Sequence, residues 1–192
     1  MRLDNYTTYS PTAPLWQQIL WYFLGDPFFR SRWLFFSGLK VWILRCFGAT
    51  VGSNVRIKPN VTVKFPWQLT VGDYVWIGEN AWFDNIAQIT IESHVCISQD
   101  VYLCTGNHNW SDPYFNLIAG EIHVEQGSWI AARSVLGPGV TVGQGAVLTM
   151  GGVAGRSLKP MTIYTGNPAQ AVKGRVVNSD EPNFTYPIAQ FK

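Results

Sequence analysis

The sequence predicts an all-β fold, a parallel solenoid of about five triangular coils that follows an N-terminal helical segment and precedes a short C-terminal tail. Three observations lead to this prediction. Large apolar residues recur at every sixth position, departures from the repeat fall at one point of the coil, and the first fifty residues lack the repeat. The expected organisation is a helical cap over 1–50, a repeat domain over 51–169 and a tail over 170–192.

The repeat occupies fifteen positions in phase. A period of six is neither the 3.6 of a helix nor the 2 of an ordinary strand, so it favours short flat strands joined by tight turns, three to a coil. Each leading residue then stacks on its counterpart one coil away, at about 4.8 Å. A β-sandwich with Gly-rich turns is the alternative, and the sustained phase argues against it. The leading residues are Val51, Ile57, Val63, Val71, Ile77, Phe83, Ile91, Ile97, Leu103, Ile118, Val124, Ile130, Leu136, Val142 and Leu148.

The departures from the repeat are the pair Leu69 and Thr70, the pair Ile89 and Thr90, and the segment 109–117. Each follows the third hexapeptide of a coil, which predicts that all three lie at the same corner of a triangular prism. His108 then stands at that corner, at the root of a protruding loop. On this interpretation the third face stacks residues 83–88, 103–108, 130–135 and 148–153.

Residues 1–50 are rich in aromatic side chains and predict helices. Asp26 before Pro27 is typical of a helix start, and Gly48 of a helix end. The tryptophans are Trp16, Trp21, Trp33 and Trp42, and the interspersed basic residues are Arg30, Arg32, Lys40 and Arg45. These charges interrupt any membrane-spanning run of about 18 apolar residues. Two roles remain open: a cap over the edge strands of the prism, or peripheral contact with a membrane.

Composition narrows the class of protein. With 192 residues and 47% hydrophobic content the chain can bury a sizeable core, and its net charge of +2 gives no support for a nucleic-acid partner. Its three cysteines, an odd number, indicate reduced packing residues in a cytosolic protein. The first eleven residues lack the apolar core of a signal peptide. We therefore expect a cytoplasmic location, with a peripheral association at the inner membrane face as the further option.

Three stretches carry a family resemblance: CTGNH at 104–108, GSWIAARSVLGPGVTVGQGAVLTMGGV at 127–153 and YTGNPAQAVKGR at 164–175. They resemble the hexapeptide-repeat acyltransferases, and most of all the colanic-acid-biosynthesis branch of O-acetyltransferases, which is related to galactoside and maltose acetyltransferases. The likeness spans roughly residues 28–176. It implies a left-handed parallel β-helix, a homotrimer, and acetyl-CoA bound as co-substrate between neighbouring prisms. The implied reaction is acetylation of a sugar hydroxyl in exopolysaccharide biosynthesis, without a metal.

His108 matches the catalytic base of that family. A hydroxyl attacks a thioester slowly at neutral pH, and a histidine with a pKa of about 6.5 is suited to remove its proton. Asn85 stands near the acceptor-binding asparagine of sugar-acetylating relatives, with Asp84 as its rival. Trp110 and Tyr114, in the loop, offer aromatic faces to a sugar ring.

The residues assigned to acetyl-CoA are Trp129, Ala131, Ala132, Thr149, Arg156 and Lys173. Trp129 matches an aromatic residue that flanks the acetyl group in relatives. The alanines are small enough for a pantetheine arm to approach the backbone, and the Ala132 amide is suited to bond the thioester oxygen. Relatives often carry Thr-Lys where this chain has Gly155 and Arg156, so the cation for the CoA phosphates is kept and the hydroxyl is lost.

Other functions remain as alternatives. A γ-type zinc carbonic anhydrase needs three converging imidazoles, but His94, His108 and His123, spaced by 14 and 15 residues, lack its close pair. A non-catalytic scaffold is disfavoured because the histidine and the small-residue groove occur together. Another small hydroxyl or an amine as acceptor stays open, since the same base serves both.

Overall fold

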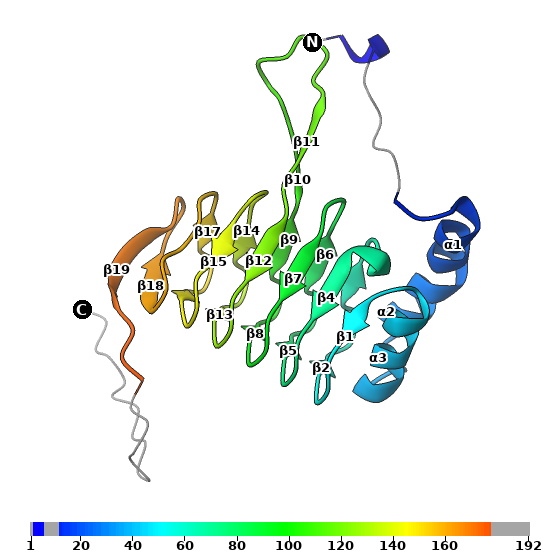
Figure 1. The fold of residues 1–192 in the computed structure, drawn as a ribbon, viewed down its shortest axis with the longest axis horizontal. Helices are drawn as coiled ribbons and strands as arrows, with labels where there is room; N and C mark the ends of the chain where they lie inside the picture. The colour runs from blue at the N-terminus through cyan, green and yellow to red at the C-terminus, as the bar shows by residue number, and fades with distance from the viewer. Residues whose placement is uncertain (1, 6–11, 178–192) are drawn as a thin grey trace.

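Three sheets of parallel strands wind into a triangular prism in the computed structural model, which describes residues 2–5 and 12–177 (Figure 1). The first sheet holds β1 (Thr50–Val51), β4 (Leu69–Val71), β7 (Ile89–Ile91), β12 (Ile122–Val124) and β15 (Thr141–Val142). The second holds β2 (Arg56–Ile57), β5 (Trp76–Ile77), β8 (Cys96–Ile97), β13 (Trp129–Ile130) and β16 (Val147–Leu148), extended by β18 (Thr162–Thr165) and β19 (Gln170–Gly174). The third holds β3 (Thr62–Val63), β6 (Trp82–Asp84), β9 (Tyr102–Cys104), β14 (Val135–Leu136) and β17 (Val153–Ala154). The predicted left-handed parallel β-helix of about five coils is confirmed.

The core is a set of stacks of like residues. In the third sheet Val63 pairs with Phe83, Phe83 with Leu103, and Leu103 with Leu136, and all four side chains are buried. Successive side chains of a strand point to opposite faces, so one residue of each short strand enters the core while its neighbour faces outward. The inward positions of the repeat therefore supply a continuous apolar core along the prism.

The corner between the second and third sheets is held by a ladder of side-chain hydrogen bonds. Asn60 Nδ2 donates to Asn80 Oδ1 at 2.7 Å, and Asn80 Nδ2 donates to Asp100 Oδ1 at 2.9 Å. All three residues have positive φ, which asparagine and aspartate tolerate better than most residues. The recurring polar residue at this corner thus serves the tight turn and the stacking of coils together.

All three departures from the repeat fall where the chain passes from the third sheet to the first, as predicted, and Leu69, Thr70, Ile89 and Thr90 are themselves paired residues of β4 and β7. The third one is longer than predicted, because β10 (Gly106–His108) and β11 (Leu117–Ala119) form an antiparallel hairpin that projects from the prism (Figure 1). Ile118 pairs with Asn107 in this hairpin and is 49% exposed. The prediction that Ile118 leads a coil is therefore wrong.

Because Ile118 does not lead a coil, each later hexapeptide lies one face earlier than predicted. Ile130 stacks on Ile97 in the second sheet, and Leu136, not Ile130, stacks on Leu103 in the third. The prediction that residues 130–135 and 148–153 continue the third face is wrong for the same reason. A slip of one whole hexapeptide leaves the inward phase unchanged, so the period could not reveal it.

The helices cover the end of the prism next to β1 (Figure 1). After the short turn η1 (Leu3–Asn5), α1 (Leu15–Leu20), the π-helical turn η2 (Trp21–Gly25) and α2 (Asp26–Arg30) follow one another without a break. Asp26 is itself helical, and its N–H bonds to the carbonyl of Trp21, so the prediction that Asp26 caps a helix start is wrong. A π turn lacks the regular i→i−4 ladder, and it lies directly before Pro27, which has no N–H to give to that ladder.

The next helix, α3 (Ser37–Cys46), ends as the sequence predicts. Gly48 has a φ of 94°, and the N–H groups of Gly48 and Ala49 bond to the carbonyls of Arg45 and Leu44. This pairing is a Schellman motif, which leaves the helix through a left-handed glycine. Residues 31–36 separate α2 from α3, so residues 26–47 do not form one helix.

Side chains of the cap donate hydrogen bonds to carbonyl groups of the first coil. Trp21 Nε1 donates to the carbonyl of Val63 at 3.1 Å, Lys40 Nζ to that of Lys58 at 2.9 Å, and Arg45 to that of Val51 at 2.6 Å. Trp21 and Lys40 are buried. The cap thus satisfies carbonyl groups at the open end of the prism, as expected for a cover over edge strands.

At the opposite end β18 and β19 form an antiparallel hairpin that continues the second sheet (Figure 1). The predicted boundary between repeat domain and tail, at 169/170, falls inside this hairpin, so residues 170–174 belong to the sheet. Most of the terminal segment 177–192, to which the sequence assigned no role, lies outside the described residues.

Candidate active site

The candidate site is a cleft of about 530 Å³ beside the root of the β10–β11 hairpin. Strands β6 and β9 of the third sheet and the hairpin provide most of its lining. The residues with polar or aromatic side chains that line it are Lys64, Phe65, Asp84, Tyr102, Cys104 and His108. Asp84 and His108, both predicted from the sequence as site residues, therefore line the same space.

His108 lies on β10 opposite Leu117 of β11. Its Nδ1 is 2.9 Å from the carbonyl oxygen of Phe115, and the two rings stack with centroids 4.3 Å apart. A carbonyl oxygen only accepts hydrogen bonds, so in the neutral ring Nδ1 carries the hydrogen and Nε2 carries the lone pair. The sequence predicts this histidine at the root of the loop, and the structure places it there with Nδ1 held by the hairpin backbone.

Phe115 holds an unusual backbone conformation, with a φ of 55°. Such a φ is rare for a bulky residue and costs of order 1 kcal/mol or more. The strained residue is the one whose carbonyl and ring both contact His108. The conformation of the hairpin is thus tied to the orientation of the imidazole.

Asp84 is fixed by two partners within the cleft. Its Oδ1 pairs with Lys64 Nζ at 2.8 Å, and its Oδ2 accepts a hydrogen bond from the Tyr102 hydroxyl at 2.9 Å. Burial, followed by hydrogen bonds to Cys104 and Asp84, raises the pKa of Tyr102 well above its usual range. Tyr102 therefore remains a hydrogen-bond donor to the carboxylate at physiological pH.

Asn85 has a different place. Its side chain is buried, its Nδ2 donates to the carbonyls of Phe65 and Gln68, and its Oδ1 accepts from the Phe65 N–H. It holds the turn that contains η3 (Pro66–Gln68) and does not line the cleft. Of the two rivals for acceptor contact, only Asp84 lines the cleft that contains His108.

Lys64 and Tyr102 are site residues that the sequence reasoning missed. Both stand next to a leading apolar residue, Val63 and Leu103, on the opposite side of the strand. Alternation along the strand turns them outward on the face that carries Asp84. That signal was available in the sequence, because the coils of Val63, Phe83 and Leu103 stack as predicted.

The two aromatic residues of the loop lie away from this cleft in the single chain. Trp110 is exposed at the tip of the hairpin, and the N–H of Tyr114 bonds to Asp112 Oδ1. Neither side chain is among those that line the His108 cleft.

The residues assigned to acetyl-CoA gather elsewhere. Trp129 lies on β13, with Nε1 donating to Ser98 Oγ at 2.9 Å, and Ala131, Ala132 and Thr149 lie at the corner between the second and third sheets. Thr149 Oγ1 is buried and has no hydrogen-bond partner in the part of the chain that the structure describes. His108 stands at the other edge of the third sheet. One chain therefore does not bring His108 together with this group.

Two cations assigned to the CoA phosphates are exposed. Arg156 follows β17 at the corner between the third and first sheets, and Lys173 lies on β19. Both side chains are accessible to an anion from solvent.

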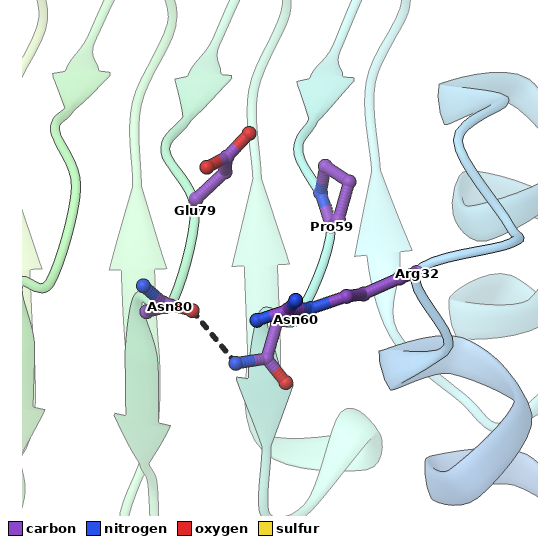
Figure 2. A pocket seen from close by; sticks show the side chains of 5 residues that line it. All are labelled: Arg32, Pro59, Asn60, Glu79 and Asn80. Carbon is purple, nitrogen blue, oxygen red and sulfur yellow. Dashed lines mark hydrogen bonds between the residues drawn. The ribbon is translucent and has the colours of Figure 1, made fainter.

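A second hollow, of about 320 Å³, lies near the cap at the corner of the asparagine ladder. Figure 2 shows Arg32 extending from the segment after α2 toward Asn60, with Pro59, Glu79 and Asn80 around it. The amides of Asn60 and Asn80 bond to each other. The described residues that line it include no histidine or cysteine, so the His108 cleft is the better candidate for proton transfer.

The three histidines occupy separate places. His94 stacks on Tyr74 with centroids 5.1 Å apart, and His123 Nε2 lies 2.8 Å from Glu92 Oε1. No group of three or more metal-binding side chains occurs within residues 2–5 and 12–177. Within one chain the three imidazoles thus do not converge. Among the helices in the same ranges, none has the length and apolar character needed to cross a bilayer.

Comparison with known proteins gives relatives of one kind. No family model matches the chain. It is 37% identical over 154 residues to the colanic acid biosynthesis acetyltransferase WcaF of Escherichia coli K12, covering 80% of this chain and 81% of that one. An acetyltransferase of Staphylococcus aureus strain COL is 30% identical over 139 residues, covering 71% and 69%.

Solved structures agree in fold. A hexapeptide-repeat acetyltransferase of Vibrio cholerae matches with a TM-score of 0.75 and 23% identity, covering 84% of this chain and 94% of that one. A galactoside acetyltransferase in complex with coenzyme A matches with a TM-score of 0.72 and 21% identity, covering 83% and 79%. The repeat, the histidine at the hairpin and these relatives identify the chain as a member of the hexapeptide-repeat acetyltransferases, alongside the colanic acid biosynthesis acetyltransferases.

Proposed function

We propose that the protein transfers an acetyl group from acetyl-CoA to a sugar hydroxyl, with His108 as general base, in exopolysaccharide biosynthesis. The observation that carries the proposal is the imidazole held by the Phe115 carbonyl in a cleft that also contains Asp84. The WcaF relative supports the exopolysaccharide role, and the Vibrio cholerae relative solved with acetyl-CoA supports the donor.

In this mechanism the Phe115 carbonyl fixes the hydrogen on Nδ1, and Nε2 accepts the proton of the acceptor hydroxyl. The hydroxyl oxygen bonds to the thioester carbonyl carbon as the proton leaves. The carbon–sulfur bond then breaks, and the imidazolium returns the proton to the leaving sulfur. The same carbonyl stabilises the imidazolium between the two proton transfers.

Asp84 is the proposed acceptor contact. Carboxylate oxygens accept hydrogen bonds from sugar hydroxyls, and the bonds from Lys64 and Tyr102 hold this carboxylate in one orientation. Trp110 and Tyr114 are proposed to complete the acceptor site from the hairpin, against a sugar bound across a neighbouring subunit.

The site is proposed to be shared between chains of a homotrimer. His108 and the group Trp129, Ala131, Ala132 and Thr149 stand at opposite edges of the third sheet. A second chain that brings its edge to the hairpin unites them, and a closed ring of three chains gives three equal sites. Arg156 and Lys173 are proposed to bind the CoA phosphates.

The protein is proposed to work in the cytoplasm and to visit the inner membrane face through its cap. Trp21 and Lys40 are buried and Arg45 bonds to the first coil, so the contact is assigned to Trp16, Trp33 and Trp42 with Arg30 and Arg32. Exposed aromatic rings with basic residues suit the headgroup boundary of an anionic membrane.

The test of the reaction is His108→Ala with purified protein, acetyl-CoA and a panel of sugars, nucleotide sugars and glycans. We expect the acetylation rate to fall by about 10²–10⁴-fold while the KM for acetyl-CoA stays within a few-fold. His123→Ala, which alters a histidine outside the cleft, is the matched control and should keep its rate. A His108→Ala rate near that of the wild type removes His108 from the mechanism, and the absence of any acetylated sugar in the panel rejects the acceptor class.

A further inference from the structure

A second groove lies next to the active-site cleft, between the helical cap and the turn after β3. It measures about 460 Å³. Ile19, Trp21, Tyr22 and Phe23 form its helical wall, and Phe65 and Trp67 form the wall on the prism. Apart from these six, the described residues that line it are Gln18 and Lys64, so no carboxylate lines it. The groove is suited to an apolar guest.

The groove and the His108 cleft share a wall. Lys64 and Phe65 line both. The Phe65 ring stacks on Trp67 with centroids 5.0 Å apart on the groove side, whereas Lys64 Nζ pairs with Asp84 on the cleft side. The wall that the two pockets share therefore changes from aromatic on the groove side to polar on the cleft side, at Lys64 and Phe65.

The helical wall is open to solvent in the single chain. Ile19, Tyr22 and Phe23 are all exposed. An apolar surface that remains uncovered next to a reactive centre indicates a binding site, because leaving it in water is unfavourable.

We propose that this groove binds the apolar chain of an amphipathic acceptor, a glycolipid whose sugar enters the His108 cleft. The proposal rests on the proposed acetylation of a sugar. It is supported by the shared residues Lys64 and Phe65, since one molecule with an apolar chain next to a sugar spans both spaces. It assigns a role to Ile19, Tyr22 and Phe23 that capping the prism does not require.

The test measures binding rather than turnover. Methyl and dodecyl β-maltoside, the latter below its critical micelle concentration, are titrated into the intact protein by calorimetry. Burial of a methylene group changes affinity by about 4-fold, so we expect dodecyl maltoside to bind at least about 10-fold more tightly. Equal affinities overturn the proposal. Tighter binding of the dodecyl compound without acetylation of any sugar keeps the groove and rejects the reaction.

Two Phe→Ser substitutions, one inside the groove and one outside it, test where the dodecyl chain binds. Phe23→Ser alters the groove, and Phe35→Ser alters an aromatic residue of the same cap outside it; the two side chains are 67% and 64% exposed. We expect the preference for the dodecyl chain to fall several-fold in Phe23→Ser and to persist in Phe35→Ser. An equal loss in both variants means general adsorption to an apolar surface and overturns the proposal. Loss of the native oligomer in Phe23→Ser, seen by light scattering, means that a second copy covers the groove and overturns it as well.

Discussion

Lys40 is a charged residue in the interior of the cap. Its ammonium group is buried, donates to the Lys58 carbonyl and lies 5.2 Å from the centroid of the Phe29 ring. Burial lowers the pKa of Lys40 to about 8. A hydrogen bond and a ring face thus replace only part of the lost hydration.

This residue predicts how stability depends on pH. Between about pH 8 and 10.5 the unfolded chain keeps a proton on Lys40 that the folded chain has released. The unfolded state then binds more protons, so the free energy of unfolding rises with pH across this window, and the penalty is complete below it. We expect the wild type to gain stability relative to Lys40→Met between pH 7.5 and 10 in urea titrations. Groups that titrate alike in both proteins cancel in the difference between their free energies of unfolding. A difference that stays constant between pH 7.5 and 10 would contradict the prediction.

Asp84 and Asn85 show how adjacent residues acquire unrelated roles. Asp84 is the last residue of β6 and faces outward to Lys64 and Tyr102, whereas Asn85 turns inward and binds the backbone of the turn one coil earlier. Both are short polar residues. The direction in which the side chain points, and not the residue type, decides which one lines the cleft.

The turn that ends α3 depends on a glycine. Gly48 has a φ of 94°, and a Cβ there would lie 3.2 Å from Trp67 Cβ. Gly38, near the start of α3, has nothing within 4 Å of such a Cβ. The two glycines therefore differ in backbone conformation and in surroundings.

We expect Gly48→Ala to destabilise the protein by about 1–2 kcal/mol, because alanine resists the left-handed conformation. Gly38→Ala should instead stabilise it by about 0.5–1 kcal/mol, since alanine loses less backbone entropy in a helix. Urea midpoints at unchanged m-values measure both. Equal shifts in the two variants would show that the Schellman turn does not control the stability of the cap.

At the scale of the molecule, the two halves of the proposed site stand at different corners of the prism. This arrangement predicts complementation. Co-expressed His108→Ala and Ala132→Trp chains, each inactive alone, should recover activity, because one interface of a mixed ring combines an intact base with an intact donor groove. Random mixing leaves about a quarter of the sites intact. Activity that remains at the background of either variant alone would place the whole site within one chain.

The cap also exposes aromatic side chains at one end of the prism. We expect the protein to co-sediment with anionic vesicles at low salt and to dissociate as salt rises. The double variant Trp33→Ser/Trp42→Ser, which changes residues 90% and 60% exposed, should bind several-fold more weakly. Trp76→Ser, on the second sheet and 53% exposed, is the control. Wild-type binding no stronger to anionic than to neutral vesicles would reject the basic residues as part of the contact.

The sequence alone determined the class of fold, the inward residues of most coils and the corner that carries His108. These features depend on local spacing, because each short strand presents a fixed residue to the core. The end of α3 at Gly48 was determined in the same way, by the conformation that glycine permits.

Only the tertiary structure decided which coils stack after the hairpin and which polar residues share the cleft. Ile118 and Val124 are six residues apart, so either can lead a coil, and the pairing of Ile118 with Asn107 excludes the first. Because Val124 and not Ile118 leads that coil, Ala132 and Thr149 lie at the edge of the third sheet opposite His108. Stacking is a contact between residues 16 to 33 positions apart, which no local period encodes.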